Sequence, residues 1–249
     1  QSSDFAKLAI IVYLSRLLVK KKDVLNKWKG GFWPVVIPVL VICGLIVKDN
    51  FSTAALLFAI CLAIMFLGRV PFLKLASIVG GGITLLMLAV LLHKAAPELN
   101  LLPRLETWEN RITNRMEDDK DVIVNAQSLN FYYSSFVEEF GLISAFVLIL
   151  LYLILLYRIM RIGMRSDNLF ETYVCVGIGI LMLTQASVNM LVCTGVFPVT
   201  GQNMPLLAMG GSALIMSCLA LGIVQSIASK QTEKAGKKEK EEESEIAVA

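Results

Sequence analysis

Long apolar runs separated by charged links dominate this sequence of 249 residues. An α-helix needs about 20 apolar residues to cross a bilayer, and a helix satisfies its own backbone hydrogen bonds where no water is available. The runs that approach this length cover residues 4–19, 33–47, 51–68, 72–93, 131–157, 169–193 and 205–228. The sequence therefore predicts an all-α polytopic membrane protein, with seven transmembrane helices in one bundle over residues 1–228.

The charges in the links predict how this bundle lies in the membrane. The link over residues 16–29 is strongly basic, with Asp23 as its one acidic residue. Lys and Arg are enriched in cytoplasmic loops, so this link is expected in the cytoplasm. Counting spans from there places residues 94–130 outside and the tail, residues 229–249, inside. The tail is a block of Lys and Glu, expected to be disordered or a frayed helix.

Several functions find no support in the composition. The net charge of +3 is small and does not indicate a nucleic-acid partner. The five cysteines lie in apolar runs without paired spacing, which indicates neither a metal site nor a disulfide framework. No cofactor is expected, although a divalent cation stays open. The sequence also lacks a serine, histidine and acid combination and a glycine-rich phosphate loop.

Charged residues inside apolar runs are costly and often functional. Lys7 lies about one turn inside the first run, where it either snorkels back to the headgroups or points inward toward an anionic ligand. Glu138 and Glu139 lie near the start of the run 131–157, so at least one is expected at or below the membrane interface. The polar corner 49–54 fits a capped helical hairpin between two spans.

Polar and helix-breaking residues also surround the last two runs. Gln185 and Asn189 are four residues apart and share one helical face, from which they can hydrogen-bond to a neighbouring span. Two Gly and two Pro residues in the segment 194–205 force a structured turn rather than a continued helix. Gly210, Gly211 and Ser212 then favour close helix contact.

In combination these segments resemble the SEDS family (shape, elongation, division and sporulation), the FtsW/RodA-like peptidoglycan glycosyltransferases. The family motif Gln-Pro-Ser-Glu-x-Ala-Lys is similar to residues 1–7, and its Pro-Asp-x-Gly-Thr-Ala corner to residues 49–54. The motif Asp-Phe-Ile-x-Ala-x-x-x-Glu-Glu-x-Gly aligns with residues 130–141. The family series Asn, Pro-Val-Thr-Gly, Pro and Gly-Gly-Ser matches Asn189, residues 198–201, Pro205 and residues 210–212.

The resemblance implies a fold of ten spans, with three spans before Gln1. It also implies lipid II polymerisation at the outer face of the bacterial cytoplasmic (inner) membrane, in which a sugar hydroxyl displaces undecaprenyl pyrophosphate. A carboxylate acts as general base in such a reaction, and a cation such as Lys7 offsets charge on the pyrophosphate. The implied partners are a single-span class B penicillin-binding protein and other division or elongation proteins. The implied substrate-binding residues are Lys7, Asn50, Gln185, Asn189 and Thr200.

One position departs from the family in the chemistry that it can perform. The family's catalytic Asp falls on Asn130, whose carboxamide cannot accept a proton as a carboxylate can. The family's long loop before this Asp is also missing, since Leu129 alone separates residues 127–128 from Asn130. Glu138 or Glu139 is then the alternative base, although their main expected role is structural. Two other functions stay open: a flippase or transporter of the lipid-linked precursor, and a catalytically inactive scaffold of the divisome.

Overall fold

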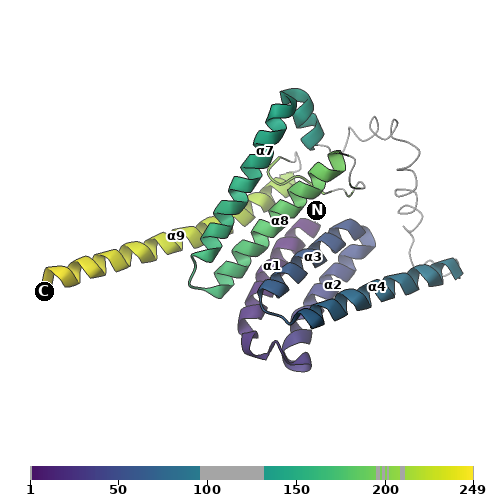
Figure 1. The fold of residues 1–249 in the computed structure, drawn as a ribbon, viewed down its shortest axis with the longest axis horizontal. Helices are drawn as coiled ribbons and strands as arrows, with labels where there is room; N and C mark the ends of the chain where they lie inside the picture. The colour runs from purple at the N-terminus through teal and green to yellow at the C-terminus, as the bar shows by residue number, and fades with distance from the viewer. Residues whose placement is uncertain are drawn as a thin grey trace.

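The structure, a computed structural model, describes residues 2–95, 132–194, 197, 200, 202–207 and 211–248. Within these ranges every regular element is a helix (Figure 1). Asn130 and nearly all of the expected outer segment 94–130 lie outside the described residues. The helices are α1 (Ser2–Lys20), η1 (Lys22–Val24), η2 (Trp28–Phe32), α2 (Trp33–Asp49), α3 (Phe51–Leu67), α4 (Phe72–Ala95), α7 (Tyr132–Met164), α8 (Leu169–Cys193) and α9 (Gly211–Val248).

The long helices fall on the apolar runs of the sequence. Phe51–Leu67 and Phe72–Leu85 are shorter apolar helices. Four helical stretches are long and apolar enough to cross a membrane, namely Trp28–Val47, Phe136–Met164, Leu169–Cys193 and Gly211–Lys237. The prediction of an all-helical, multi-pass membrane protein is therefore confirmed for the described residues, while the full count of spans stays a prediction.

Helix α8 lies between α1–α3 on one side and α7 with α9 on the other (Figure 1). A Cβ atom on Gly177 would lie 2.5 Å from Ile11 Cγ2 and 2.9 Å from Ile64 Cδ1, so α1 and α3 approach α8 very closely. The largest apolar cluster joins α1 to α2 and α3 through fully buried side chains such as Leu14 and Leu57. This packing holds the start of α1, where the candidate site begins, against α3 and α8.

Helix α4 is the least enclosed of the apolar helices. It contacts α3, and its later residues extend away from the other helices (Figure 1). Leu75 near its start is buried, whereas Leu85, Met87 and Leu91 are exposed. Lipid tails are as apolar as leucine, so the exposed face of α4 suits contact with the bilayer.

The run expected as one helix over 131–157 is bent sharply at Gly141 within α7 (Figure 1). Gly141 has φ 79° and ψ 175°, a conformation that glycine adopts readily because it has no Cβ atom. The bend separates residues 132–140 from the long part of α7, which continues past residue 157 to Met164. The prediction of one uninterrupted helix is therefore corrected at Gly141, and Glu138 and Glu139 lie exposed before the bend.

The last helix also differs from its expected bounds. Helix α9 begins at Gly211 rather than at residue 205, because Pro205 lies in a turn that interrupts the helical backbone. At its other end α9 continues to Val248, so residues 229–248 are helical, the second of the two alternatives expected for the tail. Glu233 and Lys237 form an i,i+4 ion pair of 2.7 Å on this part of the helix, a pairing that supports exposed helices.

Candidate functional site

The candidate site begins with two charged residues in the first turns of α1. Lys7 Nζ lies 2.9 Å from Asp4 Oδ1, and the two side chains are only 4% and 8% exposed. Residues three apart lie on the same face of a helix, so the local fold of α1 brings this pair together. Of the two orientations considered for Lys7, the structure shows the inward one.

A segment after α8 supplies the second partner of Lys7. Lys7 Nζ donates a hydrogen bond of 3.3 Å to Gln202 Oε1, and Gln202 Nε2 donates one of 2.5 Å to Thr53 Oγ1. Asn189 Nδ2 donates to the backbone carbonyl of Gln202 at 2.9 Å. Asn189 thus bonds to the chain that follows its own helix. Residues from α1, α3, α8 and the 202–207 segment meet here, and we call Asp4, Lys7, Thr53 and Gln202 the Lys7 cluster.

Asn50 supports the Lys7 cluster from the corner between α2 and α3. Its Oδ1 accepts a hydrogen bond of 3.1 Å from the backbone N–H of Thr53, which makes Asn50 the N-cap of α3. Asn is among the preferred N-cap residues because its side chain satisfies a free N–H at the helix start. The corner over residues 49–54, predicted to be a capped helical hairpin, therefore also holds the backbone of Thr53 in place, and the Thr53 side chain contacts Gln202.

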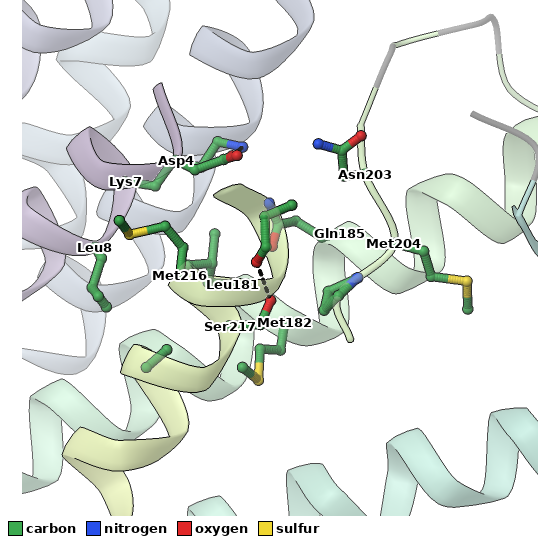
Figure 2. Close-up of a pocket in the computed structure, with 13 residues that line it drawn as sticks. Asp4, Lys7, Leu8, Leu181, Met182, Gln185, Asn203, Met204, Met216 and Ser217 are labelled. Carbon is green, nitrogen blue, oxygen red and sulfur yellow. Dashed lines mark hydrogen bonds and ion pairs between the residues drawn. The ribbon is translucent and has the colours of Figure 1, made fainter. Parts of the chain in front are cut away.

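A small pocket of about 30 Å³ opens beside Asp4 and Lys7. Figure 2 shows Asp4 and Lys7 on one side of this pocket and Asn203 on the other. Asp4 Oδ2 is buried and has no hydrogen-bond partner among the described residues. The pocket is lined by Asp4, Lys7, Leu8, Leu181, Met182, Gln185, Asn203, Met204, Pro205, Ala213, Met216, Ser217 and Ala220.

The arrangement suits a ligand that carries negative charge and hydroxyl groups. An ammonium group has three donors and no acceptor, and within the described residues Asp4 and Gln202 use two of the donors of Lys7. The third remains for a ligand at the pocket. Asp4 Oδ2 offers an acceptor close by, because a buried carboxylate oxygen without a donor is unfavourable until one arrives. The described residues contain no group of three His, Cys, Asp or Glu that could hold a metal ion.

The predicted site residues divide into those that the structure brings together and those that it does not. Lys7 and Gln185 line the pocket. Asn50 and Asn189 do not line it, but they hydrogen-bond to the backbone of two residues of the Lys7 cluster, Thr53 and Gln202. Thr200 is buried but does not line the pocket. Glu138 and Glu139 are exposed and do not line it either. Asn130 lies outside the described residues.

Sequence reasoning did not select Asp4, Thr53 and Gln202 as site residues. Asp4 could have been found, because an acid three residues before an intramembrane lysine is its natural partner on a helix. Thr53 and Gln202 gave no such local signal. They are 149 residues apart in the chain and meet only through the packing of α3 against α8.

A second polar cluster lies at the other end of α8. Glu171 Oε1 accepts a hydrogen bond of 2.7 Å from Lys230 Nζ, and Glu171 Oε2 accepts one of 2.5 Å from Ser166 Oγ. We call these three residues the Glu171 cluster. It joins α8 to α9 and to the turn after α7. Neither Glu171 nor Lys230 lines the pocket.

The sequence of this chain matches a known protein family. The family model described as cell cycle protein, FtsW/RodA/SpoVE, matches residues 1–129 and 120–233. The probable peptidoglycan glycosyltransferase FtsW of Trichlorobacter lovleyi is 29% identical over 92% of this chain and 66% of its own length. The protein of the same name in Coxiella burnetii is 29% identical over 92% of this chain and 68% of its own length. The chain thus spans about two thirds of the length of these relatives.

Two solved structures share the fold. One is a chain from a peptidoglycan synthase complex, studied for its coordination of polymerization and crosslinking, with a TM-score of 0.70, 23% identity and coverage of 93% of this chain and 70% of that one. The other is a mutant of the rod shape determining protein RodA of Thermus thermophilus, with a TM-score of 0.64, 21% identity and coverage of 93% and 66%. Because the family model matches most of the residues, this chain belongs to the FtsW/RodA/SpoVE family of cell cycle proteins.

Proposed function

We propose that this protein is a peptidoglycan glycosyltransferase that polymerises lipid II at the outer face of the bacterial cytoplasmic membrane. The observation that carries the proposal is a buried lysine at an open pocket, in a family whose curated relatives are named peptidoglycan glycosyltransferases. We further propose that the described helices are the C-terminal seven of a ten-span bundle. In this topology residues 94–130 lie outside and the C-terminal segment lies in the cytoplasm.

Lys7 has the chemistry to assist departure of the leaving group. The acceptor sugar hydroxyl attacks the anomeric carbon of the growing chain, and the bond from that carbon to the pyrophosphate oxygen breaks. Negative charge then develops on undecaprenyl pyrophosphate, and a fixed cation stabilises it most in a site with little water. The free donor of Lys7 at the pocket is suited to this role. Gln185 and Asn203, which line the same pocket, offer amides to the polar parts of the substrate.

The proton of the attacking hydroxyl requires a base. Asn130 cannot supply it, because a carboxamide does not accept a proton at neutral pH. Glu138 and Glu139 are the first carboxylates after this position along the chain, and both are exposed before the bend at Gly141. We propose that one of them accepts the proton. Glu138→Gln and Glu139→Gln variants, compared in glycan formation, identify which one.

The decisive experiment determines the covalent sequence of the purified protein and measures the activity of the same sample. Intact mass and peptide mapping across residues 120–140 establish the outer loop, and the same purified sample is then incubated with lipid II. Glycan chains that disappear in Lys7→Met and persist in Lys230→Met support the proposal. A protein with the short loop and Asn130 that forms no glycan contradicts it and leaves a scaffold role.

The proposed partner is a single-span class B penicillin-binding protein that crosslinks the product. Support comes from the fold shared with a chain of a peptidoglycan synthase complex. Co-purification of the two proteins from a membrane extract tests this. A transporter of the same lipid-linked precursor has less support, because Ile11 and Leu14 below Lys7 are fully buried in an apolar cluster rather than beside a polar path.

A further inference from the structure

We infer that Gln202 is a positioning residue for Lys7, which turns the ammonium group toward a diphosphate in the pocket and connects it to the corner between α2 and α3. The inference rests on the proposed function, which supplies the diphosphate. Gln202 itself is absent from the pocket lining, so it acts through Lys7. The motifs that carry the family resemblance do not include this residue.

Gln202 is fixed at three points. Its Oε1 accepts from Lys7 Nζ at 3.3 Å, its Nε2 donates to Thr53 Oγ1 at 2.5 Å, and its backbone carbonyl accepts from Asn189 Nδ2 at 2.9 Å. All four residues are buried. A glutamine side chain normally has several freely populated rotamers, and these contacts select one of them. The segment after α8 therefore holds a rigid amide against Lys7.

The orientation of this amide follows from the chemistry of its neighbours. An ammonium group is only a donor, so the amide oxygen has to face Lys7. The amide nitrogen then faces Thr53, whose hydroxyl oxygen accepts its hydrogen. The reversed amide would place an N–H group against the ammonium group. Asn50 in turn holds the backbone of Thr53 at 3.1 Å, so a continuous set of hydrogen bonds runs from the corner to Lys7.

This set of bonds decides where the ammonium group points. With Asp4 as its only acceptor, Lys7 could rotate about one hydrogen bond. With Gln202 as a second acceptor, two directions are set, and the third hydrogen is directed by the tetrahedral geometry of the nitrogen. The neutral amide does this without adding negative charge next to a diphosphate. A carboxylate at residue 202 would instead compete with the ligand for Lys7.

The first test measures the binding of undecaprenyl pyrophosphate to the full chain in detergent micelles. We expect Gln202→Leu, which removes the acceptor at similar size, to weaken binding about tenfold, the usual effect of losing a hydrogen bond to a charged group. Gln202→Glu should weaken binding more, because the added charge neutralises Lys7. Gln231→Leu is the matched control, since Gln231 bonds to the Ile162 carbonyl away from the pocket, and its affinity should stay within about twofold.

Gln202→Glu also tests whether Lys7 faces the diphosphate. A carboxylate can still accept from both Lys7 and the Thr53 hydroxyl, so this variant keeps the bridge while changing its charge. If Lys7 did not face the diphosphate, this added charge would leave binding unchanged, and Gln202→Glu would bind the diphosphate as the parent protein does. Equal affinity of these two proteins would therefore overturn the inference.

The second test examines the connection to Thr53. Thr53→Val should weaken diphosphate binding in the same direction as Gln202→Leu but less, while Thr53→Ser keeps the hydroxyl and should bind as the parent. The double variant Thr53→Val with Gln202→Leu should lose no more than Gln202→Leu alone, because both changes interrupt one set of bonds. Fully additive losses would show that Thr53 does not act through Gln202.

Glycan formation from lipid II, measured on the same variants, distinguishes the two proposals. If the parent protein binds the diphosphate in a Gln202-dependent manner but forms no glycan, the polymerase function fails and the positioning role stands. If the parent forms glycan while Gln202→Leu and Gln202→Glu keep its kcat and KM, the positioning role fails and the function stands. A parent protein that does not bind the diphosphate also overturns the positioning role.

Discussion

The two polar clusters at opposite ends of α8 use similar residues in different ways. Each contains one acid and one lysine that form an ion pair, of 2.9 Å between Asp4 and Lys7 and of 2.7 Å between Glu171 and Lys230. In the Lys7 cluster both partners are buried, one carboxylate oxygen has no donor within the described part of the chain, and a pocket adjoins the pair. In the Glu171 cluster Lys230 is 57% exposed and both carboxylate oxygens accept hydrogen bonds.

The difference indicates which ion pair is available for a ligand. In the Glu171 cluster both carboxylate oxygens already accept hydrogen bonds and the lysine is exposed to solvent, and such exposed pairs contribute about 0–1 kcal/mol to stability. A buried pair with a free donor and a free acceptor is unfavourable on its own and gains partners when a ligand binds. The Glu171 cluster therefore joins helices, and the Lys7 cluster is suited to binding.

The largest effect is expected for Lys7→Met. We expect at least a hundredfold loss of glycan formation, the usual scale for removing one donor to a developing negative charge. The free energy of unfolding should fall by about 3–5 kcal/mol, because Asp4 is left buried without its cation. Activity assays and thermal unfolding in detergent measure the two effects.

The double variant Asp4→Asn with Lys7→Met separates these effects. It removes both charges, so much of the stability should return while activity stays lost. Recovery of activity in the double variant would contradict the assignment of Lys7 as the cation that assists the leaving group.

Two glycines at close helix contacts, one near each cluster, allow the two ends of α8 to be tested separately. A Cβ atom on Gly177 would meet Ile11 on α1, one turn beyond Lys7, and a Cβ atom on Gly163 would lie 2.8 Å from Cys175 Cβ. Gly177→Ala and Gly163→Ala should each lower the free energy of unfolding by about 1–3 kcal/mol through overpacking. Only Gly177→Ala should also reduce diphosphate binding. Equal loss of binding in both variants would remove the distinction between the two ends.

The bend in α7 provides a smaller test. Gly141→Ala should lower stability by about 1–2 kcal/mol, because a residue with a Cβ atom is disfavoured at φ 79°. If Glu138 or Glu139 is the base, glycan formation should fall while diphosphate binding stays at the parent level, because the Lys7 cluster is untouched. Unchanged glycan formation at reduced stability would argue against a base on residues 132–140.

The smallest effect is expected for Lys230→Met in the Glu171 cluster. Because Lys230 is more than half exposed, the free energy of unfolding should change by about 1 kcal/mol or less. Glycan formation should stay within about twofold of the parent. A large loss of activity would show that the Glu171 cluster affects the site through α8 or α9.

Much of the fold could be predicted because apolar runs identify membrane helices directly. The helices α1, α2, α3, α4 and α8 begin and end within a few residues of the predicted runs. The errors lie where one residue overrides the pattern. Gly141 bends an apolar run without interrupting it, and Pro205 lies in a turn over residues 205–207, where a helix was expected to begin.

The site was only partly predictable, for a related reason. Lys7 could be selected because a lysine inside an apolar run is rare and costly, and Asn50 because its corner has the chemistry of a helix cap. Nothing near Gln202 in the sequence indicates that it reaches Lys7, which is 195 residues away in the chain. Glu138 and Glu139 were selected because of their apolar surroundings in the sequence, and in the structure both are exposed on the segment before the bend at Gly141.

The sequence by itself determined that this chain is a multi-pass helical membrane protein of the FtsW/RodA/SpoVE family, because hydropathy and short motifs are local properties that lipid and helix geometry constrain strongly. Which polar residues act together depends on how the helices pack. The Lys7 cluster exists because the close packing of α1 and α3 on α8, at Gly177, brings three distant segments within hydrogen-bonding distance. Hydrogen bonds act over about 3 Å, so their partners are set by packing rather than by position along the chain.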